Sequence, residues 1–322
     1  MTKLSPLASV SETRATLEAH GLSTKYSLGQ NFLINDGILQ KIVALADLKP
    51  DDYVLEVGPG IGTLTIALLK TAGRVLSVER DPDLPAVLVE TLAPWSDRFT
   101  LISKDALDLT TKDVQTASAP SVILSGARSA ESKDPVQGPR LLPNKFVANL
   151  PYAVAATVVL DYFELFPSLD SATIMVQKEV ADRMAARPGS KNYGAYTVKL
   201  RLYAEPAGRF AVGPGNFFPP PRVDSAVLRL NRRPVCDDAG VPLDAAAIAA
   251  ACTMAEAAFA TRRKTLSNSC KTYFAGRGAA GARIIAALPQ LFERAGVDPK
   301  LRGETLDVPA FVRLGKAYQD LA

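Results

Sequence analysis

The stretch VLEVGPGIGTLT, at residues 54–65, is the most informative about the fold. An apolar run that is typical of a buried strand ends at Val57, and Gly58, Gly60 and Gly62 follow at alternate positions before an apolar helical segment begins. Glycine lets the main chain approach a ligand closely, and the start of a helix offers free N–H groups to an anionic group. The stretch therefore predicts a strand, a ligand-binding turn and a helix.

Short apolar segments alternate with helical segments from residue 53 onwards. We expect strands at residues 53–57, 75–78, 99–103, 146–148 and 172–176, and helices at residues 63–70 and 82–92. Two more strands are expected at residues 196–203 and 223–230, the second entered through three prolines. This order predicts an α/β, Rossmann-like fold with a mostly parallel sheet of seven strands. Ligands bind such sheets at the carboxyl ends of the strands.

The other parts of the chain indicate a long insertion and a helical region. Residues 114–143 are rich in Ser, Ala, Pro and Gly, so we expect a surface loop there, with a short strand at residues 121–124. Asp244 is expected to cap a helix that ends near Ala260. Further helices are expected at residues 289–295 and 309–321. We therefore predict a first domain at residues 1–234 and a small all-α domain at residues 235–322.

Composition excludes several classes of site. The chain has 322 residues, of which 48% are hydrophobic, but no apolar run is long enough to span a bilayer, so we expect a cytoplasmic protein. Its 3 cysteines have no CxxC spacing, and its single histidine, His20, lies outside any strand-end motif. We therefore expect no metal site and no chemistry that needs imidazole.

Acidic residues follow the next two expected strands. Glu79 stands 21 residues after Gly58, where a carboxylate can accept hydrogen bonds from two ribose hydroxyls. Asp105 could accept from the exocyclic amine of an adenine, although either acid alone could be a helix cap. The spacing G-x-G-x-G after Glu56 differs from the dinucleotide pattern G-x-G-x-x-G. Together these residues favour S-adenosylmethionine over a nicotinamide cofactor.

The fourth expected strand ends in the stretch FVANLPYAVAAT, at residues 146–157. Asn149 and the main chain of Leu150 could present carbonyl oxygens that accept both hydrogens of an exocyclic amine. Pro151 fixes the turn and has no N–H to compete, and Tyr152 offers an aromatic face to a flipped base. Such acceptors favour a tetrahedral nitrogen that can attack a methyl sulfonium without a general base. An ordinary strand-terminating turn is the alternative.

Charge is unevenly distributed along the chain. Residues 1–205 hold 21 Lys and Arg against 23 Asp and Glu, whereas residues 206–322 hold 16 against 10. No acidic residue occurs at residues 257–292, which carry a cluster of Lys and Arg. This pattern indicates a polyanion such as RNA as the partner, and a solvated helix face is the alternative.

Taken together, these motifs resemble those of the ribosomal RNA adenine N6-dimethyltransferases. The matching segments are SLGQNFLIND, VLEVGPGIGTLT, VERD, KDAL, FVANLPY, MVQKEVADRM, KNYGAY, NFFPPPRVDSAVLRL and FATRRKTLSNS, in family order. The resemblance implies the fold of S-adenosylmethionine-dependent methyltransferases. It also implies cofactor contacts from Asn31, Leu33, Gly58, Gly60, Glu79, Asp105 and Asn149, and an aromatic flank for the target base from Phe217.

The family resemblance also implies a substrate: two adjacent adenosines in the 3′-terminal hairpin loop of 16S rRNA, each dimethylated on the immature 30S subunit. Because these bases lie in a loop, they can be splayed out at little cost. The expected RNA contacts are Arg222, Arg262, Arg263, Lys264 and Lys271, and we expect a monomer. Three alternatives stay open: a large-subunit rRNA enzyme of the macrolide-resistance type, a non-catalytic ribosome-assembly factor, and a nicotinamide-dependent oxidoreductase.

Overall fold

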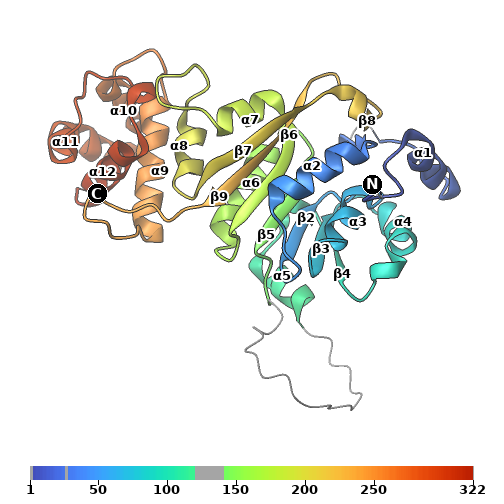
Figure 1. Cartoon of the computed structure of the whole chain (residues 1–322). Helices are drawn as coiled ribbons and strands as arrows, with labels where there is room; N and C mark the ends of the chain where they lie inside the picture. The colour runs from blue at the N-terminus through green and yellow to red at the C-terminus, as the bar shows by residue number, and fades with distance from the viewer. Residues whose placement is uncertain (1–2, 26–27, 120–140, 322) are drawn as a thin grey trace, which may run out of the picture. The chain divides into compact units, whose positions relative to one another are not determined.

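The computed structural model describes residues 3–25, 28–119 and 141–321 of the chain (Figure 1). Contacts between residues divide the chain into two compact units. The first contains Met1–Lys178 and Ala207–Leu230, and the second contains Glu179–Pro206 and Asn231–Ala322.

A sheet of seven strands forms the centre of the first unit, in the order β4-β3-β2-β5-β6-β9-β7 (Figure 1). The strands are β2 (Tyr53–Val57), β3 (Arg74–Glu79), β4 (Phe99–Ser103), β5 (Lys145–Asn149), β6 (Ser171–Gln177), β7 (Ala204–Val212) and β9 (Ser225–Arg232). The pairs β4–β3, β3–β2, β2–β5 and β5–β6 are parallel, so the carboxyl ends of these five strands meet at one edge. The predicted fold class is confirmed.

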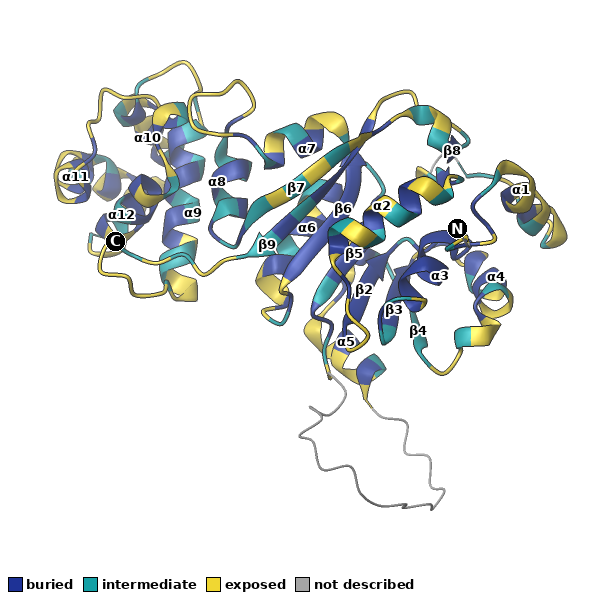
Figure 2. Ribbon diagram, viewed as in Figure 1, coloured by how far each residue is buried: buried dark blue, intermediate teal, exposed yellow. Residues whose placement is uncertain are grey.

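The central strands form because most of their residues are apolar on both faces, with Glu56 in β2 as a buried exception. All five residues of β2 are buried, and Figure 2 shows β2, β3, β5 and β6 as mostly buried, whereas β4 and β7 are largely intermediate or exposed. The helices of this unit are α1 (Val10–Ala19), α2 (Asp36–Ala46), α3 (Thr63–Leu69), α4 (Leu84–Thr91), α5 (Thr111–Ser118) and α6 (Ala155–Leu165).

A short antiparallel pair lies outside the main sheet. It joins β1 (Phe32–Leu33) to β8 (Phe217–Phe218), with Phe32 opposite Phe218 and Leu33 opposite Phe217. This pairing fixes the segment before α2 against a segment that comes almost two hundred residues later in the sequence.

The second unit is helical. It contains the helices α7 (Lys178–Met184), α8 (Ala195–Arg201), α9 (Ala245–Phe259), α10 (Leu266–Ala275), α11 (Gly278–Ala295) and α12 (Val308–Gln319). The first residue of α7, Lys178, is assigned to the first unit. Asp244 caps α9 as expected, because its carboxylate accepts the N–H of Ala247 at 2.8 Å. A Cβ at Gly315 would lie 2.6 Å from the nitrogen of Ala251, so glycine allows α12 to pack closely on α9.

The strand expected at residues 196–203 is wrong, because helix α8 occupies this segment. Its buried residues are Thr197, Val198 and Leu200. In a segment this short, the apolar residues on the buried side of a helix give a pattern that cannot be distinguished from that of a strand. The missing seventh strand is β7, whose alternation is interrupted by Pro206 and Gly208.

Two further expectations need correction. The helix expected at residues 289–295 is the last part of α11, which continues through Pro289 and begins at Gly278. The loop expected from residue 114 begins inside α5, whose start is fixed by a capping box between Thr110 and Asp113. The strand expected at residues 121–124 lies outside the described residues.

The domain boundary differs from the single boundary that we expected after residue 234. The structure places Glu179–Pro206 with the helical unit, because α8 packs against α9 there. A boundary drawn from composition cannot detect an earlier segment that returns to pack with later helices.

Candidate active site

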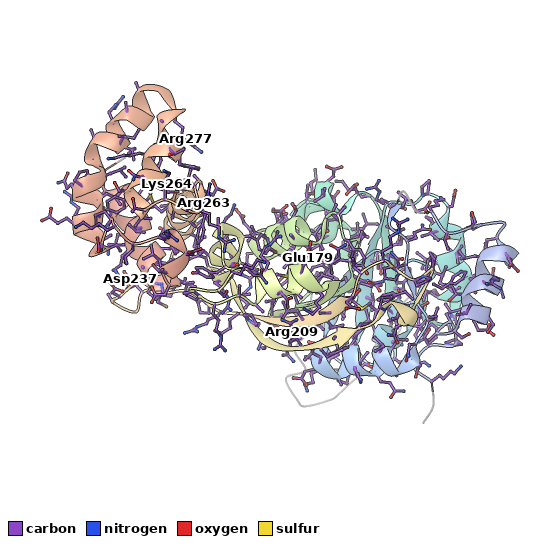
Figure 3. All side chains as sticks on the ribbon, turned by 90° about the horizontal axis from the view of Figure 1, so that it is seen from above. Glu179, Arg209, Asp237, Arg263, Lys264 and Arg277 are labelled. Carbon is purple, nitrogen blue, oxygen red and sulfur yellow. The ribbon has the colours of Figure 1, made fainter. Side chains whose placement is uncertain are left out.

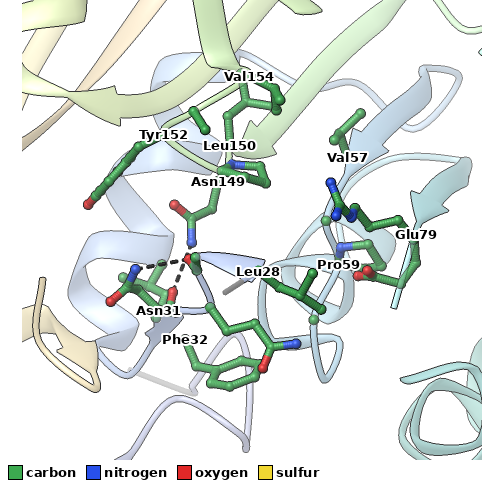
Figure 4. Close-up of a pocket in the computed structure, with 18 of the residues that line it drawn as sticks. Leu28, Asn31, Phe32, Val57, Pro59, Glu79, Asn149, Leu150, Tyr152 and Val154 are labelled. Atoms are coloured by element: carbon green, nitrogen blue, oxygen red, sulfur yellow. Dashed lines mark hydrogen bonds between the residues drawn. The ribbon is translucent and has the colours of Figure 1, made fainter. Parts of the chain in front are cut away.

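A cavity of about 570 Å³ opens at the carboxyl ends of the parallel strands in the first unit (Figure 4). Residues 28–33, 57–60, 149–154 and 219–223 line it, together with side chains that follow β3 and β4. These segments contain most of the site residues expected from the sequence, and the parallel sheet places them at one edge.

The glycine turn forms one wall of the cavity. Gly58 and Gly60 have φ angles of 69° and 61°, in the region that favours glycine. A Cβ at Gly60 would lie 3.0 Å from the ring of Phe32, so glycine is needed for space as well as conformation. The turn therefore lets a ligand approach the main chain closely.

Glu79 ends β3 with its carboxylate among main-chain N–H groups. The side chain is buried, and it accepts hydrogen bonds from the N–H groups of Gly60, Arg80 and Asp81, the last at 2.9 Å. Burial raises the pKa of Glu79 above its usual value, and these three donors oppose the shift. A carboxylate held in this way is well placed to accept hydrogen bonds from a ribose.

Asp105 follows β4 and also lines the cavity. It caps the short 3₁₀ helix Ala106–Asp108, because its carboxylate accepts the N–H of Leu107 at 3.0 Å. Its second oxygen lies 3.1 Å from the Nη1 atom of Arg80. Each carboxylate oxygen has two lone pairs, so these partners leave Asp105 able to accept a hydrogen from an adenine amine.

Asn149 ends β5, and its side chain is oriented by the N-terminal segment. Its Nδ2 atom donates a hydrogen bond to the main-chain oxygen of Asn31 at 3.2 Å (Figure 4). Because the amide nitrogen is engaged, Oδ1 remains as the acceptor of this side chain. Leu33, also expected to contact the cofactor, lines the cavity from β1 but is buried.

The rest of the tetrapeptide shapes the neighbouring wall. The N–H of Leu150 donates to the oxygen of Met175 at 3.0 Å, which ties the turn to β6. Pro151 packs close to the glycine turn, 3.8 Å from a Cβ built on Gly58. The hydroxyl of Tyr152 lies 2.7 Å from Oγ of Ser225, and burial raises the pKa of this phenol above its usual value.

The structure does not bring the ring of Phe217 into the cavity. Phe217 is 3% exposed and belongs to the hydrophobic core, where ordinary packing accounts for it. Its neighbours Pro219–Pro221 and Val223 line the cavity, as does the exposed side chain of Arg222. The base-flanking role of Phe217 stays a prediction.

The other expected RNA contacts lie in the second unit: Arg262, Arg263 and Lys264 precede α10, and Lys271 lies within it. Figure 3 labels Arg263 and Lys264. Arg263, Lys264 and Lys271 are exposed, and within the described ranges no ion pair involves them. Arg262 differs, because it pairs with Glu304 at 3.2 Å and donates to the main-chain oxygen of Lys191. Arg262 therefore has a structural role that the sequence did not indicate.

Three residues near the site were missed in the sequence. Lys25, Gln30 and Asp81 form a hydrogen-bonded group beside the cavity. The only signal for Gln30 and Asp81 was their place in the segments SLGQNFLIND and VERD, beside Asn31 and Glu79, and Lys25 had none. No group of His, Cys, Asp and Glu able to hold a metal ion occurs in the described part of the chain. Among the same residues, no helix is both long enough and apolar enough to span a membrane.

These residues fit S-adenosylmethionine, because the glycine turn admits a close ligand and Glu79 and Asp105 supply the acceptors that its nucleoside needs. Fold and cavity together define a Rossmann-like methyltransferase. A family model described as Ribosomal RNA adenine dimethylase matches residues 21–287, and the chain belongs to this family. The predictions of a methyltransferase and of its cofactor are thereby confirmed.

Curated relatives match nearly the whole chain. The chain is 38% identical over 300 residues to the ribosomal RNA small subunit methyltransferase A of Thermobifida fusca, with 92% of this chain and 91% of the relative covered. It is 39% identical over 314 residues to the protein of the same name from Kineococcus radiotolerans, with 97% and 91% covered.

Two solved structures resemble the chain in fold. A dimethyladenosine transferase from Plasmodium falciparum has a TM-score of 0.66 at 22% identity, covering 88% of this chain and 95% of its own. The 23S rRNA methyltransferase ErmE has a TM-score of 0.57 at 26% identity, covering 90% and 100%.

Proposed function

We propose that this protein transfers methyl groups from S-adenosylmethionine to N6 of two adjacent adenosines in the 3′-terminal hairpin loop of 16S rRNA, dimethylating each one on the immature 30S subunit. The names of the curated relatives, at 38% and 39% identity, support the small-subunit substrate. The hydrogen bond from Asn149 to Asn31 carries the chemical part of the proposal.

The Asn149 amide holds the amine that is methylated. With Nδ2 donating to Asn31, Oδ1 accepts one N6 hydrogen, and the main-chain oxygen of Leu150 accepts the other. These acceptors favour a tetrahedral N6, whose lone pair is less delocalised into the ring. The bound cofactor supplies an electrophilic methyl group. The methyl–sulfur bond breaks as the bond from N6 to the methyl group forms. No general base is needed before attack, because the nitrogen becomes acidic only after methylation and then loses its proton to water.

An aromatic and apolar wall holds the base. The ring of Tyr152 offers a stacking face, and its bond to Ser225 fixes the angle of the ring. Pro219–Pro221 and Val223 line the same cavity and exclude water from the base. Because the Tyr152 pKa is raised, its phenol stays neutral and serves in binding rather than as a base.

Affinity for the RNA comes from cations. Arg222 at the cavity, and Arg263, Lys264 and Lys271 in the helical unit, are exposed side chains that suit phosphate contacts. The first unit would carry the cofactor and the second unit most of the RNA contacts. A monomer in the cytoplasm, where ribosomal subunits are assembled, completes the proposal.

A large-subunit rRNA enzyme is the second candidate, and the structural likeness to ErmE supports it. The chain is only 26% identical to ErmE but 38% identical to a small-subunit methyltransferase, so the small-subunit substrate is better supported. A non-catalytic assembly factor is disfavoured because Glu79, Asp105 and Asn149 all line the cavity. Family membership leaves no support for a nicotinamide-dependent oxidoreductase.

The decisive experiment supplies labelled S-adenosylmethionine and the purified protein to small subunits from a strain that lacks this modification. Mass spectrometry of the 3′-terminal fragment should show dimethyladenosine at two adjacent positions. Protein-free 23S rRNA serves as the competing substrate. Labelling of 23S rRNA with no labelling of small subunits would overturn the proposal in favour of the second candidate.

A further inference from the structure

Three side chains join the N-terminal segment to the loop that follows β3. The carboxylate of Asp81 accepts hydrogen bonds from Nζ of Lys25 at 2.6 Å and from Nε2 of Gln30 at 2.7 Å. The main-chain N–H of Lys25 donates to Oε1 of Gln30 at 2.9 Å, which closes a ring of three residues. We call Lys25, Gln30 and Asp81 the Asp81 clamp.

The Asp81 clamp is more than a surface ion pair. The side chain of Asp81 is only 2% exposed, whereas exposed pairs contribute little to stability. Burial alone would raise the pKa of Asp81, but the bonds from Lys25, Gln30 and the N–H of Asp83 hold it below the usual value. An ionised, buried carboxylate that loses a donor is left uncompensated, so each donor matters.

One end of the clamp reaches the residue that accepts the ribose hydroxyls. Asp81 stands two residues after Glu79, and its main-chain N–H donates to Oε1 of Glu79 at 2.9 Å. The Asp81 main chain, together with the N–H groups of Gly60 and Arg80, therefore orients the Glu79 carboxylate.

The other end reaches the residue that holds the target amine. Gln30 precedes Asn31, whose main-chain oxygen accepts the bond from Asn149 at 3.2 Å. A primary amide can rotate and exchange its oxygen for its nitrogen, so a fixed acceptor at Asn31 is what keeps Oδ1 of Asn149 toward the target. Beyond Asn31, the pairing of Phe32 with Phe218 fixes the segment from the opposite side. Asn31 thus lies between two anchors.

We propose that Gln30 and Asp81 are positioning residues for methyl transfer, which fix the Asn149 amide through Asn31 and the Glu79 carboxylate through the Asp81 N–H. Lys25 neutralises Asp81 within this arrangement. The inference rests on the proposed reaction at Asn149, and it assigns roles to two residues that touch neither the methyl group nor the amine.

The test uses reciprocal substitutions in the full chain. Gln30→Glu places two carboxylates against each other, and Asp81→Asn leaves Lys25 with the carboxylate of Asp83, at 2.5 Å, but without that of Asp81. In the combined variant, a carboxylate at position 30 again faces a side-chain amide at position 81. The main-chain N–H of Lys25 can still donate to the side chain at position 30. We expect each single variant to lower kcat about tenfold, as small misplacements at a reacting centre do, and the combined variant to recover to within about threefold of the unchanged protein.

Three further measurements separate positioning from general damage. The KM for small subunits should change less than twofold in every variant, because no RNA contact is altered. Calorimetry should show weaker cofactor binding for Asp81→Asn, since the main-chain N–H of residue 81, which donates to Glu79, is less firmly held in place. Lys49→Met is the matched control, because Lys49 pairs with Asp47 at the same 2.6 Å but lies away from the cavity.

The outcomes are distinct. Recovery in the combined variant, with an unchanged KM, supports the inference even if the single variants unfold at lower temperature. Single variants that behave like Lys49→Met, or a combined variant with the summed loss of both changes, would overturn it. Failure of the unchanged protein to methylate small subunits would instead contradict the proposed function.

Discussion

The side-chain amide of Asn149 donates to the main-chain oxygen of Asn31, 118 residues earlier in the chain, at 3.2 Å. In the proposed reaction, this bond leaves Oδ1 as the acceptor for the target amine. We expect Asn149→Ala to lower kcat about 100-fold, the size of effect seen when one aligned polar group is removed from an active site. RNA affinity, measured by filter binding, should stay within twofold; a matching loss of RNA affinity would show that Asn149 acts in binding instead.

Replacement of Glu79 separates cofactor binding from RNA binding. Glu79→Ala removes a buried acceptor of two charge-assisted hydrogen bonds, each contributing about 1.5–3 kcal/mol. Cofactor affinity measured by calorimetry should fall at least 100-fold, while affinity for small subunits remains. Equal loss of both affinities would contradict the separation between the two units.

Two substitutions at Tyr152 distinguish the ring from its hydroxyl. Tyr152→Phe keeps the stacking face and loses only the bond to Ser225, so kcat/KM should fall less than about fivefold. Tyr152→Ala removes stacking that contributes about 1–3 kcal/mol, which corresponds to a loss of about 5–150-fold. Steady-state kinetics on small subunits provide the comparison, and similar losses in both variants would show that the hydroxyl is the important group.

The sheet and most of the site could be predicted from the sequence for a physical reason. Strands buried on both faces are continuous apolar runs, and a parallel sheet brings the residues after each strand to one edge, so Gly58, Glu79, Asp105 and Asn149 were found without knowledge of contacts. The same reasoning fails for β7, because Pro206 and Gly208 interrupt its pattern.

Contacts between distant segments could not be predicted. Lys25 and Asp81 are separated by 56 positions, and no periodicity links them. For Phe217, the sequence motif predicts a base contact, but the structure places its ring in the core, which local sequence could not show. Local sequence identifies candidate residues, whereas burial and partners depend on the whole fold.

The cations of the helical unit can be tested through salt dependence. Replacing Arg263, Lys264 or Lys271 by Ala should each reduce the slope of log affinity against log salt concentration by about 1, because each variant neutralises one RNA phosphate fewer. Arg313→Ala is the control, because Arg313 already lies near Asp238 at 3.7 Å. Unchanged slopes for all three variants would indicate a solvated surface that does not bind RNA.

Glu56 links the stability of the first unit to pH. Its Oε2 atom accepts hydrogen bonds from the hydroxyls of Thr65 at 2.8 Å and Ser77 at 2.7 Å, while Oε1 has no hydrogen-bond partner among the residues that the structure describes. Burial raises the pKa of Glu56 from 4.5 to about 7, and the two hydroxyls oppose the shift. Because the folded-state pKa is the higher one, this stabilising contribution is complete below pH 4.5 and is lost as pH rises through about 7.

The expected size of this effect is about 3 kcal/mol between pH 4.5 and pH 8, since each pKa unit corresponds to about 1.4 kcal/mol. Glu56→Gln keeps an oxygen for Thr65 and Ser77 but cannot ionise. Relative to the unchanged protein, its free energy of unfolding should therefore improve by up to this amount as pH rises over that interval. Urea denaturation at several pH values measures the difference, with the exposed Glu164→Gln as control. Parallel pH profiles for Glu56→Gln and the unchanged protein would show that Glu56 is ionised throughout, and that the glycine turn is built around a buried charge.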